Sequence, residues 1–68
     1  MMLINHIKQH RARLNLTQQE LAKKLGVSRQ TIISIEKCQY IPSTLLAMKI
    51  ARLFEMSFDD LFELKEEG

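Results

Sequence analysis

An arginine, a glutamine and a serine on one short segment are the side chains best placed for chemistry in this 68-residue chain. The segment reads RQTIISIE and begins at Arg29. In a helix that turns 100° per residue, Ile32 and Ile35 point to one side. The opposite side carries Gln30, Ile33, Ser34 and Lys37, with Arg29 at its edge. The outer face therefore carries guanidinium, amide and hydroxyl groups without an acid, which suits a negatively charged groove that offers hydrogen bonds.

The major groove of B-DNA is such a groove and admits one helix. Arginine pairs with guanine, glutamine pairs with adenine, serine contacts either, and an apolar group contacts the thymine methyl. We therefore predict base contacts from Arg29, Gln30 and Ser34, and a methyl contact from Ile33, which shares their face. Isolated apolar residues are also common on protein surfaces, so for Ile33 both interpretations stay open.

Contacts to the DNA backbone are predicted on either side of this segment. Gln18 stands in the first turn of a preceding helix, where free backbone N–H groups bind anions, although it can also be a simple exposed helix former. Lys37, Gln39 and Tyr40 follow the segment and are predicted to hold the other side of the backbone. Such contacts set register but carry no sequence information.

The charges divide along the chain. Residues 1–54 hold nine Lys or Arg and two acids, a net +7, whereas residues 55–68 hold six acids and one lysine, a net −5. A basic body attracts polyanions such as nucleic acid. The same division also fits a solvated surface with uneven charge.

Local signals define the elements that carry these residues. Thr17 and Glu20 form a capping-box pattern that starts a helix, Gly26 supplies a left-handed end, and Ser28 caps the next helix. Two helices of about eight residues joined by a turn that contains glycine predict a helix-turn-helix over residues 17–36.

Apolar spacing and capping residues predict three further helices. They lie at about residues 5–14, from Pro42–Ser43 to about residue 54, and after Ser57. The terminal stretches 1–4 and 61–65 are candidate short strands that pair with each other. We therefore expect one mostly helical domain over residues 1–68.

Several classes of function are disfavoured. The chain has no glycine-rich phosphate loop, no plausible nucleophile with a partnered histidine and no long apolar run, so we expect a cytoplasmic protein that is not an enzyme, with no cofactor, membrane or small-molecule partner. His6 and His10 are spaced to share a metal, but no third ligand is evident. We interpret them as surface histidines.

An ordered series of motifs spans most of the chain and consists of Leu16–Ala22, Leu25–Ile32, Ile35–Glu36, Pro42–Ser43, Ile50–Ala51 and Phe54. This series resembles the Cro-like, or Xre-type, helix-turn-helix family of phage and bacterial repressors. The resemblance covers about residues 5–62 and is strongest to short stand-alone members such as the cytolysin repressor. It implies an all-α, five-helix, lambda-repressor-like domain with a small sheet from the termini.

The resemblance also implies a function. Family members are homodimers that bind roughly palindromic operators, with the recognition helices in successive major grooves about 34 Å apart. By position, Arg29, Gln30 and Ser34 match base-reading sites, and Gln18 and Thr31 match backbone sites. We therefore expect a DNA-binding transcriptional regulator, most simply a repressor.

Further positions match structural sites of the family. Arg11 and Glu36 match an ion pair that joins the first helix to the recognition helix. Dimerisation is expected within about residues 41–64, with Ile41, Phe58 and Leu61 in the interface. Apart from the resemblance, the spacing of the fourth helix suggests surplus apolar surface, with Leu46 and Leu53 turned from the core and Leu45 opposite it.

One residue departs from the family pattern. The family commonly has Gly or Asn where this chain has Cys38, which predicts either a left-handed cysteine strained by about 1 kcal/mol or a different turn.

The rival to a repressor is a protein-interaction module, such as an antitoxin or the partner of an anti-repressor. Apolar surface on the fourth helix and around Phe58 serves that role equally well. A homodimer with salt-dependent affinity for a palindromic duplex would favour the repressor. A monomer without DNA affinity would favour the module.

Overall fold

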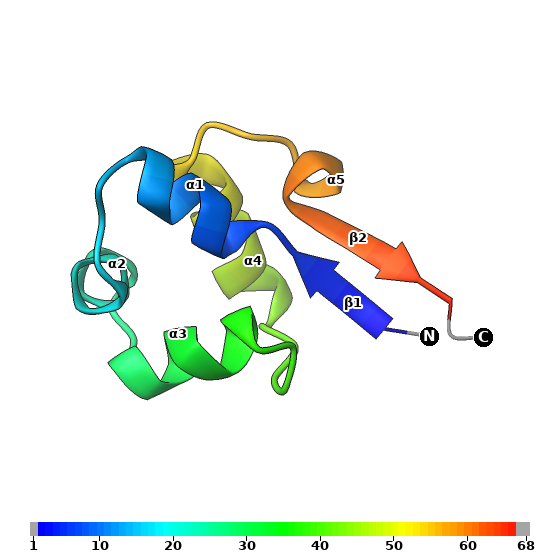
Figure 1. Ribbon diagram of the computed structural model, residues 1–68, viewed down its shortest axis with the longest axis horizontal. Coiled ribbons are helices and arrows are strands. Elements are labelled where there is room, and N and C mark those ends of the chain that lie inside the picture. The colour runs from blue at the N-terminus through cyan, green and yellow to red at the C-terminus, as the bar shows by residue number, and fades with distance from the viewer. Residues whose placement is uncertain (1, 67–68) are drawn as a thin grey trace.

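The computed structural model describes residues 2–66, which form five helices and two short strands (Figure 1). The elements are β1 (Met2–Asn5), α1 (Ile7–Arg13), α2 (Gln18–Leu25), α3 (Arg29–Glu36), α4 (Thr44–Leu53), α5 (Phe58–Leu61) and β2 (Phe62–Lys65). Figure 1 shows α2 and α3 toward one end of the molecule and the paired strands at the other. The predicted five-helix fold is confirmed. No helix within the described residues has both the length and the apolar character needed to cross a bilayer.

The terminal strands form a two-stranded antiparallel sheet, as predicted. Met2 lies opposite Lys65 and Asn5 lies opposite Phe62, while Met1 of the predicted first strand lies outside the described residues. The first helix begins later than expected, because residues 2–5 pair with β2. The Asn5 Oδ1 then accepts a hydrogen bond from the backbone N–H of Ile7 at 3.3 Å.

The core lies where α1, α2, α3, α4 and α5 meet. Within α1 only Ile7 is buried, whereas Ala12 in the helix and Leu14 directly after it are exposed. A helix of seven residues makes only about two turns, so it presents few positions to the core. The buried apolar residues are Ile7, Leu21, Ala22, Leu25, Ile32, Ile35, Leu46, Ala47, Ile50, Ala51, Phe54, Leu61 and Phe62.

Helix α4 buries a wider face than the sequence predicted. Leu46 is buried and Leu53 is half-buried against the core, so neither contributes the surplus apolar surface expected of it. The physical reason is that α4 contacts both α2 and α5, which cover it from more than one side. Leu45, on the opposite side of α4, is exposed as expected.

The capping box at the start of α2 is present as predicted. The Thr17 N–H donates to Glu20 Oε1 at 2.9 Å, and the Thr17 hydroxyl accepts from the Glu20 N–H at 3.0 Å. Hydrogen bonding of the Glu20 carboxylate, by the Thr17 backbone N–H first and by the Thr17 side chain second, lowers the pKa of this carboxyl below its ordinary value of 4.5. The carboxylate therefore adds stability above pH 4.5 that is lost as the pH falls through the lowered pKa.

Substituting Glu20→Gln should preserve the capping box, because an amide oxygen also accepts from the Thr17 N–H, but should remove this titration. Wild type is expected to be the more stable protein above pH 4.5, with a difference that shrinks as the pH falls. Urea unfolding of both proteins from pH 3 to pH 7 measures this difference in stability. A difference independent of pH would mean that the carboxylate charge contributes nothing to the cap.

Helix ends in this chain use left-handed residues, and several of them are not glycine. Gly26 closes α2 at φ 74°, while Asn15, Cys38 and Glu55 have φ angles of 57°, 61° and 54°. Cys38 therefore adopts the left-handed conformation, the first of the two outcomes that the sequence allowed. An L residue with a Cβ is strained there by roughly 1 kcal/mol.

Replacing Cys38 with Gly should raise the free energy of unfolding by up to about 1 kcal/mol, since glycine adopts positive φ without a Cβ clash. Cys38→Ala is the matched control: it also removes the thiol but keeps the strained Cβ. Thermal unfolding followed by circular dichroism compares the two. Equal stability of the two variants would show that the strain is relieved elsewhere in the turn.

Candidate nucleic-acid interface

Helix α3 has one buried face and one face open to solvent. Ile32 and Ile35 are buried in the core, as the helical spacing predicted. Arg29 and Gln30 are exposed on the other side, and Ser34 is half-buried. The guanidinium and amide groups are therefore accessible on an outer face that contains no acid.

Ile33 is less accessible than its position on the helix suggested. It is half-buried, whereas the sequence indicated an exposed isoleucine. Part of its side chain still reaches solvent, so a methyl contact with DNA is compatible with the fold but uses a smaller apolar surface.

A shallow hollow of about 270 Å³ brings several of the proposed DNA-contacting residues together. Ser28, Gln30, Thr31, Ser34 and Tyr40 line it. Gln30 Nε2 lies 3.5 Å from Ser34 Oγ, one turn further along α3, and the hydroxyls of Ser28 and Thr31 lie 2.9 Å apart. Gln30 and Ser34, which are proposed to read bases, thus lie beside Thr31 and Tyr40, which are proposed to hold the backbone.

The remaining proposed backbone contacts flank α3. Lys37 and Gln39 are exposed immediately after the helix. Gln18 is half-buried in the first turn of α2, and its Nε2 donates to Glu36 Oε1 at 3.1 Å. The Gln18 side chain therefore links α2 to the end of α3, a contact that the sequence did not indicate.

An arginine and a glutamate connect α1 to α3. Arg11 Nε donates to Glu36 Oε2 at 2.8 Å and Nη2 donates to Oε1 at 3.3 Å. Arg11 Nη1 also donates to the backbone oxygen of Leu16 at 2.9 Å. The two side chains are only 14% and 7% exposed. Together with Gln18, this network holds the end of α3 against two other elements.

Two further residues support the helix-turn-helix and were missed by sequence reasoning. Asn5 Nδ2, at the end of β1, donates to the backbone oxygen of Ile35 at 2.8 Å. Lys49 Nζ on α4 donates to the backbone oxygen of Leu25 at 3.1 Å. Both satisfy carbonyls near helix ends. No local pattern signals them, because each pair is separated by more than twenty residues.

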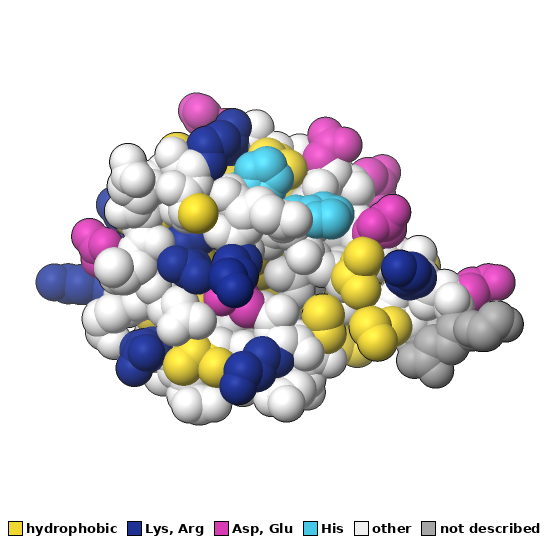
Figure 2. All heavy atoms as spheres, viewed as in Figure 1, with side chains coloured by type: hydrophobic (Ala, Val, Ile, Leu, Met, Phe, Trp, Pro, Cys, Tyr) yellow, Lys and Arg dark blue, Asp and Glu magenta, His cyan; other side chains and the backbone are white. Residues whose placement is uncertain are grey.

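Charge is distributed unevenly over the surface. In Figure 2, Lys and Arg side chains lie mostly over the part of the molecule that contains α1, α2 and α3, whereas many acids gather over α5 and β2. The basic part of the sequence and its acidic C-terminal part thus lie in different regions of the surface. The acidic end lies away from the outer face of α3. Its negative charge therefore repels a polyanion that approaches α3 only weakly.

The residues proposed for dimerisation differ in exposure. Ile41 is 68% exposed and Phe58 is 46% exposed, so both can reach a partner. Leu61 is fully buried, which corrects the proposal that it lies in the interface. It closes α5 and packs into the core instead. Leu45 and Met48 on α4, which are 70% and 61% exposed, add apolar surface near Phe58.

The two histidines do not form a pair with a common partner. His6 Nε2 lies 3.8 Å from Glu63 Oε2 on β2, while the half-buried ring of His10 packs near Phe54 with centroids 6.0 Å apart. Among residues 2–66 no group of three His, Cys, Asp or Glu side chains is placed to hold a metal ion.

Comparison with known proteins agrees with this geometry. A family model described as helix-turn-helix matches residues 7–61. An uncharacterized helix-turn-helix transcriptional regulator of Methanocaldococcus jannaschii is 56% identical over 63 residues, which are 93% of this chain and 96% of the relative. The chain belongs to the Cro/Xre-type helix-turn-helix family.

Solved structures show the same fold. A Bacteroides fragilis protein described as a candidate DNA-binding protein superposes with a TM-score of 0.79 at 29% identity, over 91% of this chain and 100% of its own. The SOS-response transcriptional repressor LexA of Eubacterium rectale gives a TM-score of 0.78 at 32% identity, over 91% of this chain and 66% of its own.

Proposed function

We propose that this DNA-binding regulator is a transcriptional repressor that binds a palindromic operator as a homodimer, with α3 of each subunit in the major groove. The observation that carries the proposal is the outer face of α3, which presents Arg29, Gln30 and Ser34 without an acid. Relatives described as transcriptional regulators, and a structural neighbour that is a repressor, support it.

The hydrogen bonds that hold α3 in place fit a role in reading bases. Base readout requires side chains held at fixed positions, because a bidentate hydrogen bond tolerates little displacement. Glu36 at the end of α3 accepts hydrogen bonds from Arg11 and Gln18, and Asn5 binds the neighbouring Ile35 carbonyl. The recognition helix is therefore fixed by three other elements.

The backbone contacts are proposed from position. Gln18 and Thr31 stand beside the first turns of α2 and α3, whose N–H groups favour a phosphate. Lys37, Gln39 and Tyr40 stand at or beyond the far end of α3. Together they would bind the two strands that border one major groove.

Selection of bound sequences from a random duplex library tests this function. We expect a palindromic sequence whose half-sites are about one helical turn apart, and an affinity that falls steeply as salt increases. Recovery of no consensus from a folded dimer would reject sequence-specific binding. It would favour the rival function, a protein-interaction module that uses the exposed apolar surface around Phe58.

Substituting Ile41→Glu or Phe58→Glu should give folded monomers with poor operator affinity, because each places a charge on apolar surface proposed to be buried between subunits. Phe58 also stacks on Phe62 with centroids 4.8 Å apart, so Ile41→Glu is the cleaner variant. Leu14→Glu, at a similarly exposed apolar residue outside the proposed region, is the control. Sedimentation equilibrium measures the oligomeric state of each variant. Dimers that persist in the Ile41 and Phe58 variants would show that the interface lies elsewhere.

A further inference from the structure

A shallow hollow of about 270 Å³ lies between the end of α2 and the second half of α4. Lys24 and Leu25 line it from α2, and Lys49, Arg52 and Leu53 line it from α4. The lysines and the arginine are exposed, whereas Leu25 is buried and Leu53 is half-buried. The basic hollow formed by these residues therefore has an apolar floor and a positively charged rim. No acidic residue among residues 2–66 lines it.

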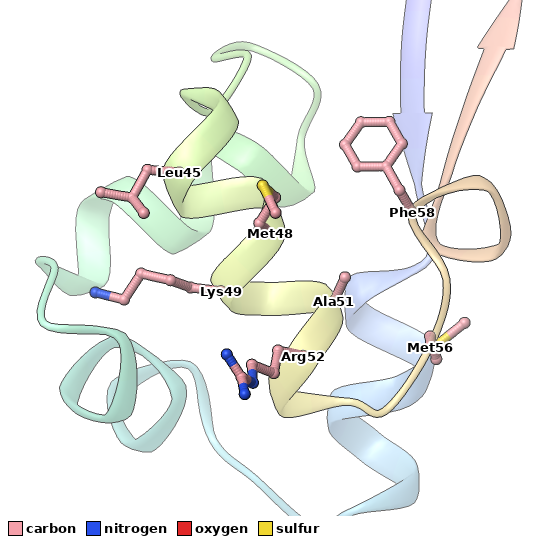
Figure 3. A pocket seen from close by; sticks show the side chains of 7 residues that line it. All are labelled: Leu45, Met48, Lys49, Ala51, Arg52, Met56 and Phe58. Atoms are coloured by element: carbon pink, nitrogen blue, oxygen red, sulfur yellow. The ribbon is translucent and has the colours of Figure 1, made fainter.

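The positive charges of the basic hollow are placed to act together. Lys49 and Arg52 extend from the same side of α4 (Figure 3), because side chains one turn apart on a helix are neighbours. Lys49 Nζ donates to the backbone oxygen of Leu25 at 3.1 Å, so this cation is held beside the floor. Neither ion pair of residues 2–66 involves Lys24, Lys49 or Arg52. These cations can therefore pair with carboxylates of another molecule.

We propose that the basic hollow binds an acidic segment of a partner protein, in which carboxylates stand on both sides of an apolar side chain. The apolar side chain covers Leu53 and the alkyl stems of the rim, which are themselves apolar. The carboxylates pair with Lys24 from α2 and with Arg52 from α4, where the guanidinium can donate two parallel hydrogen bonds to one carboxylate. This interaction surface goes beyond the proposed repressor and does not depend on it.

The composition and position of the basic hollow favour a peptide over nucleic acid. Contacts to a DNA backbone are made through charges and hydrogen bonds, and they would leave the apolar floor in water. A peptide removes that surface from water with an apolar side chain. Arg52 also lies in the last turn of α4, which ends at Phe54 near His10 of α1. The outer face of α3 lies on another side of the molecule (Figure 1).

A separate partner is also favoured over a second copy of this chain. The acids of a second copy gather over α5 and β2, toward the end of the molecule opposite α2 (Figures 1 and 2). A contact between the basic hollow of one copy and the acidic end of the next joins two different surfaces. Contacts of this kind do not close and generate open filaments.

A synthetic helical peptide with glutamates on both sides of a leucine along one face tests the proposal by calorimetric titration. We expect the protein to bind it with an affinity that falls as salt increases. A peptide with serine in place of leucine should bind at least about five-fold more weakly, because it leaves the floor uncovered. Equal binding of the two peptides, or no binding of either, would overturn the site.

Charge reversal locates the binding on the protein. Lys24→Glu combined with Arg52→Glu should weaken binding of the acidic peptide at least about ten-fold, because attraction becomes repulsion. The same variant should bind a peptide with lysines in place of the glutamates more tightly than wild type does. Lys8→Glu combined with Lys23→Glu is the matched control, since both lysines are exposed and neither lines the basic hollow.

The control changes the net charge equally and should bind the acidic peptide within about three-fold of wild type, because exposed charges outside the contact have small effects. Circular dichroism measures the folding of each variant. Lys24→Gln combined with Arg52→Gln removes the same cations without adding acids, and it gives the same comparison if the reversed variant unfolds. Losses no larger than that of the control would overturn the site.

Two measurements on the same variants distinguish other occupants. The reversed variant should bind a mixed-sequence duplex no more weakly than the control does, and its self-association in sedimentation equilibrium should match that of wild type. A selective loss of duplex affinity would assign the basic hollow to nucleic acid, and a selective loss of self-association would assign it to a second copy. Either result would overturn the peptide site. None of these measurements uses an operator, so they stand whether or not the protein is a repressor.

Discussion

Replacing Arg11 with methionine is expected to lower the free energy of unfolding by about 3 kcal/mol, because it leaves the Glu36 carboxylate largely buried without its cation. Glu36 accepts two hydrogen bonds from Arg11, and the Glu36 side chain is 7% exposed. Methionine retains most of the apolar contact that the arginine side chain makes. The loss of unfolding free energy therefore measures the effect of removing the guanidinium charge. Urea unfolding monitored by circular dichroism measures it.

A second substitution separates the ion pair from packing. Arg11→Met combined with Glu36→Gln removes both charges, and this double variant should recover much of the stability, because a neutral amide costs less to bury than an unpaired carboxylate. Gln18→Ala, which removes only the neutral hydrogen bond to Glu36, should cost about 1 kcal/mol. An Arg11→Met variant within 1 kcal/mol of wild type would show that water replaces the guanidinium.

Replacing Arg29 or Gln30 with alanine is expected to cost about 1–3 kcal/mol of specific binding per half-site. A dimer meets each lost contact twice, so the operator as a whole would lose about 2–6 kcal/mol. Discrimination should relax at one base position in each half-site. Titrations of the selected operator and its single-base variants at one fixed salt concentration measure both effects.

The matched controls use the same residue types on α1. Arg13→Ala and Gln9→Ala remove an exposed arginine and an exposed glutamine far along the chain from α3. They should leave base discrimination unchanged, although loss of a positive charge at Arg13 can weaken binding slightly on every sequence. If Arg29→Ala also weakens all sequences equally, its guanidinium contacts phosphate only.

The difference between these two experiments has a structural basis. Arg11 and Glu36 lie inside the fold and hold α3 in place, so their loss acts on folding and then on DNA binding. Arg29 and Gln30 are exposed and make no contact with another element among the hydrogen bonds of residues 2–66. Their loss should leave stability nearly unchanged, since exposed substitutions away from special contacts have small effects.

Much of the helix-turn-helix follows from the sequence alone. Thr17 and Ser28 cap helices through hydrogen bonds to residues three positions along, and Gly26 closes α2 at positive φ. The outer face of α3 follows from the spacing of Ile32 and Ile35. All of these features depend on neighbours within one or two turns, and so a linear pattern is enough to identify them.

Features set by distant parts of the chain required the tertiary structure. The burial of Leu46 and Leu61, the bond from Asn5 to the Ile35 carbonyl and the contact of Gln18 with Glu36 all join separate elements. Which elements cover a side chain depends on how helices pack, and capping residues and periodicity do not encode this. The sequence by itself therefore determined which surface of α3 faces outward, while packing decided which residues fix α3 in place and which apolar residues remain exposed.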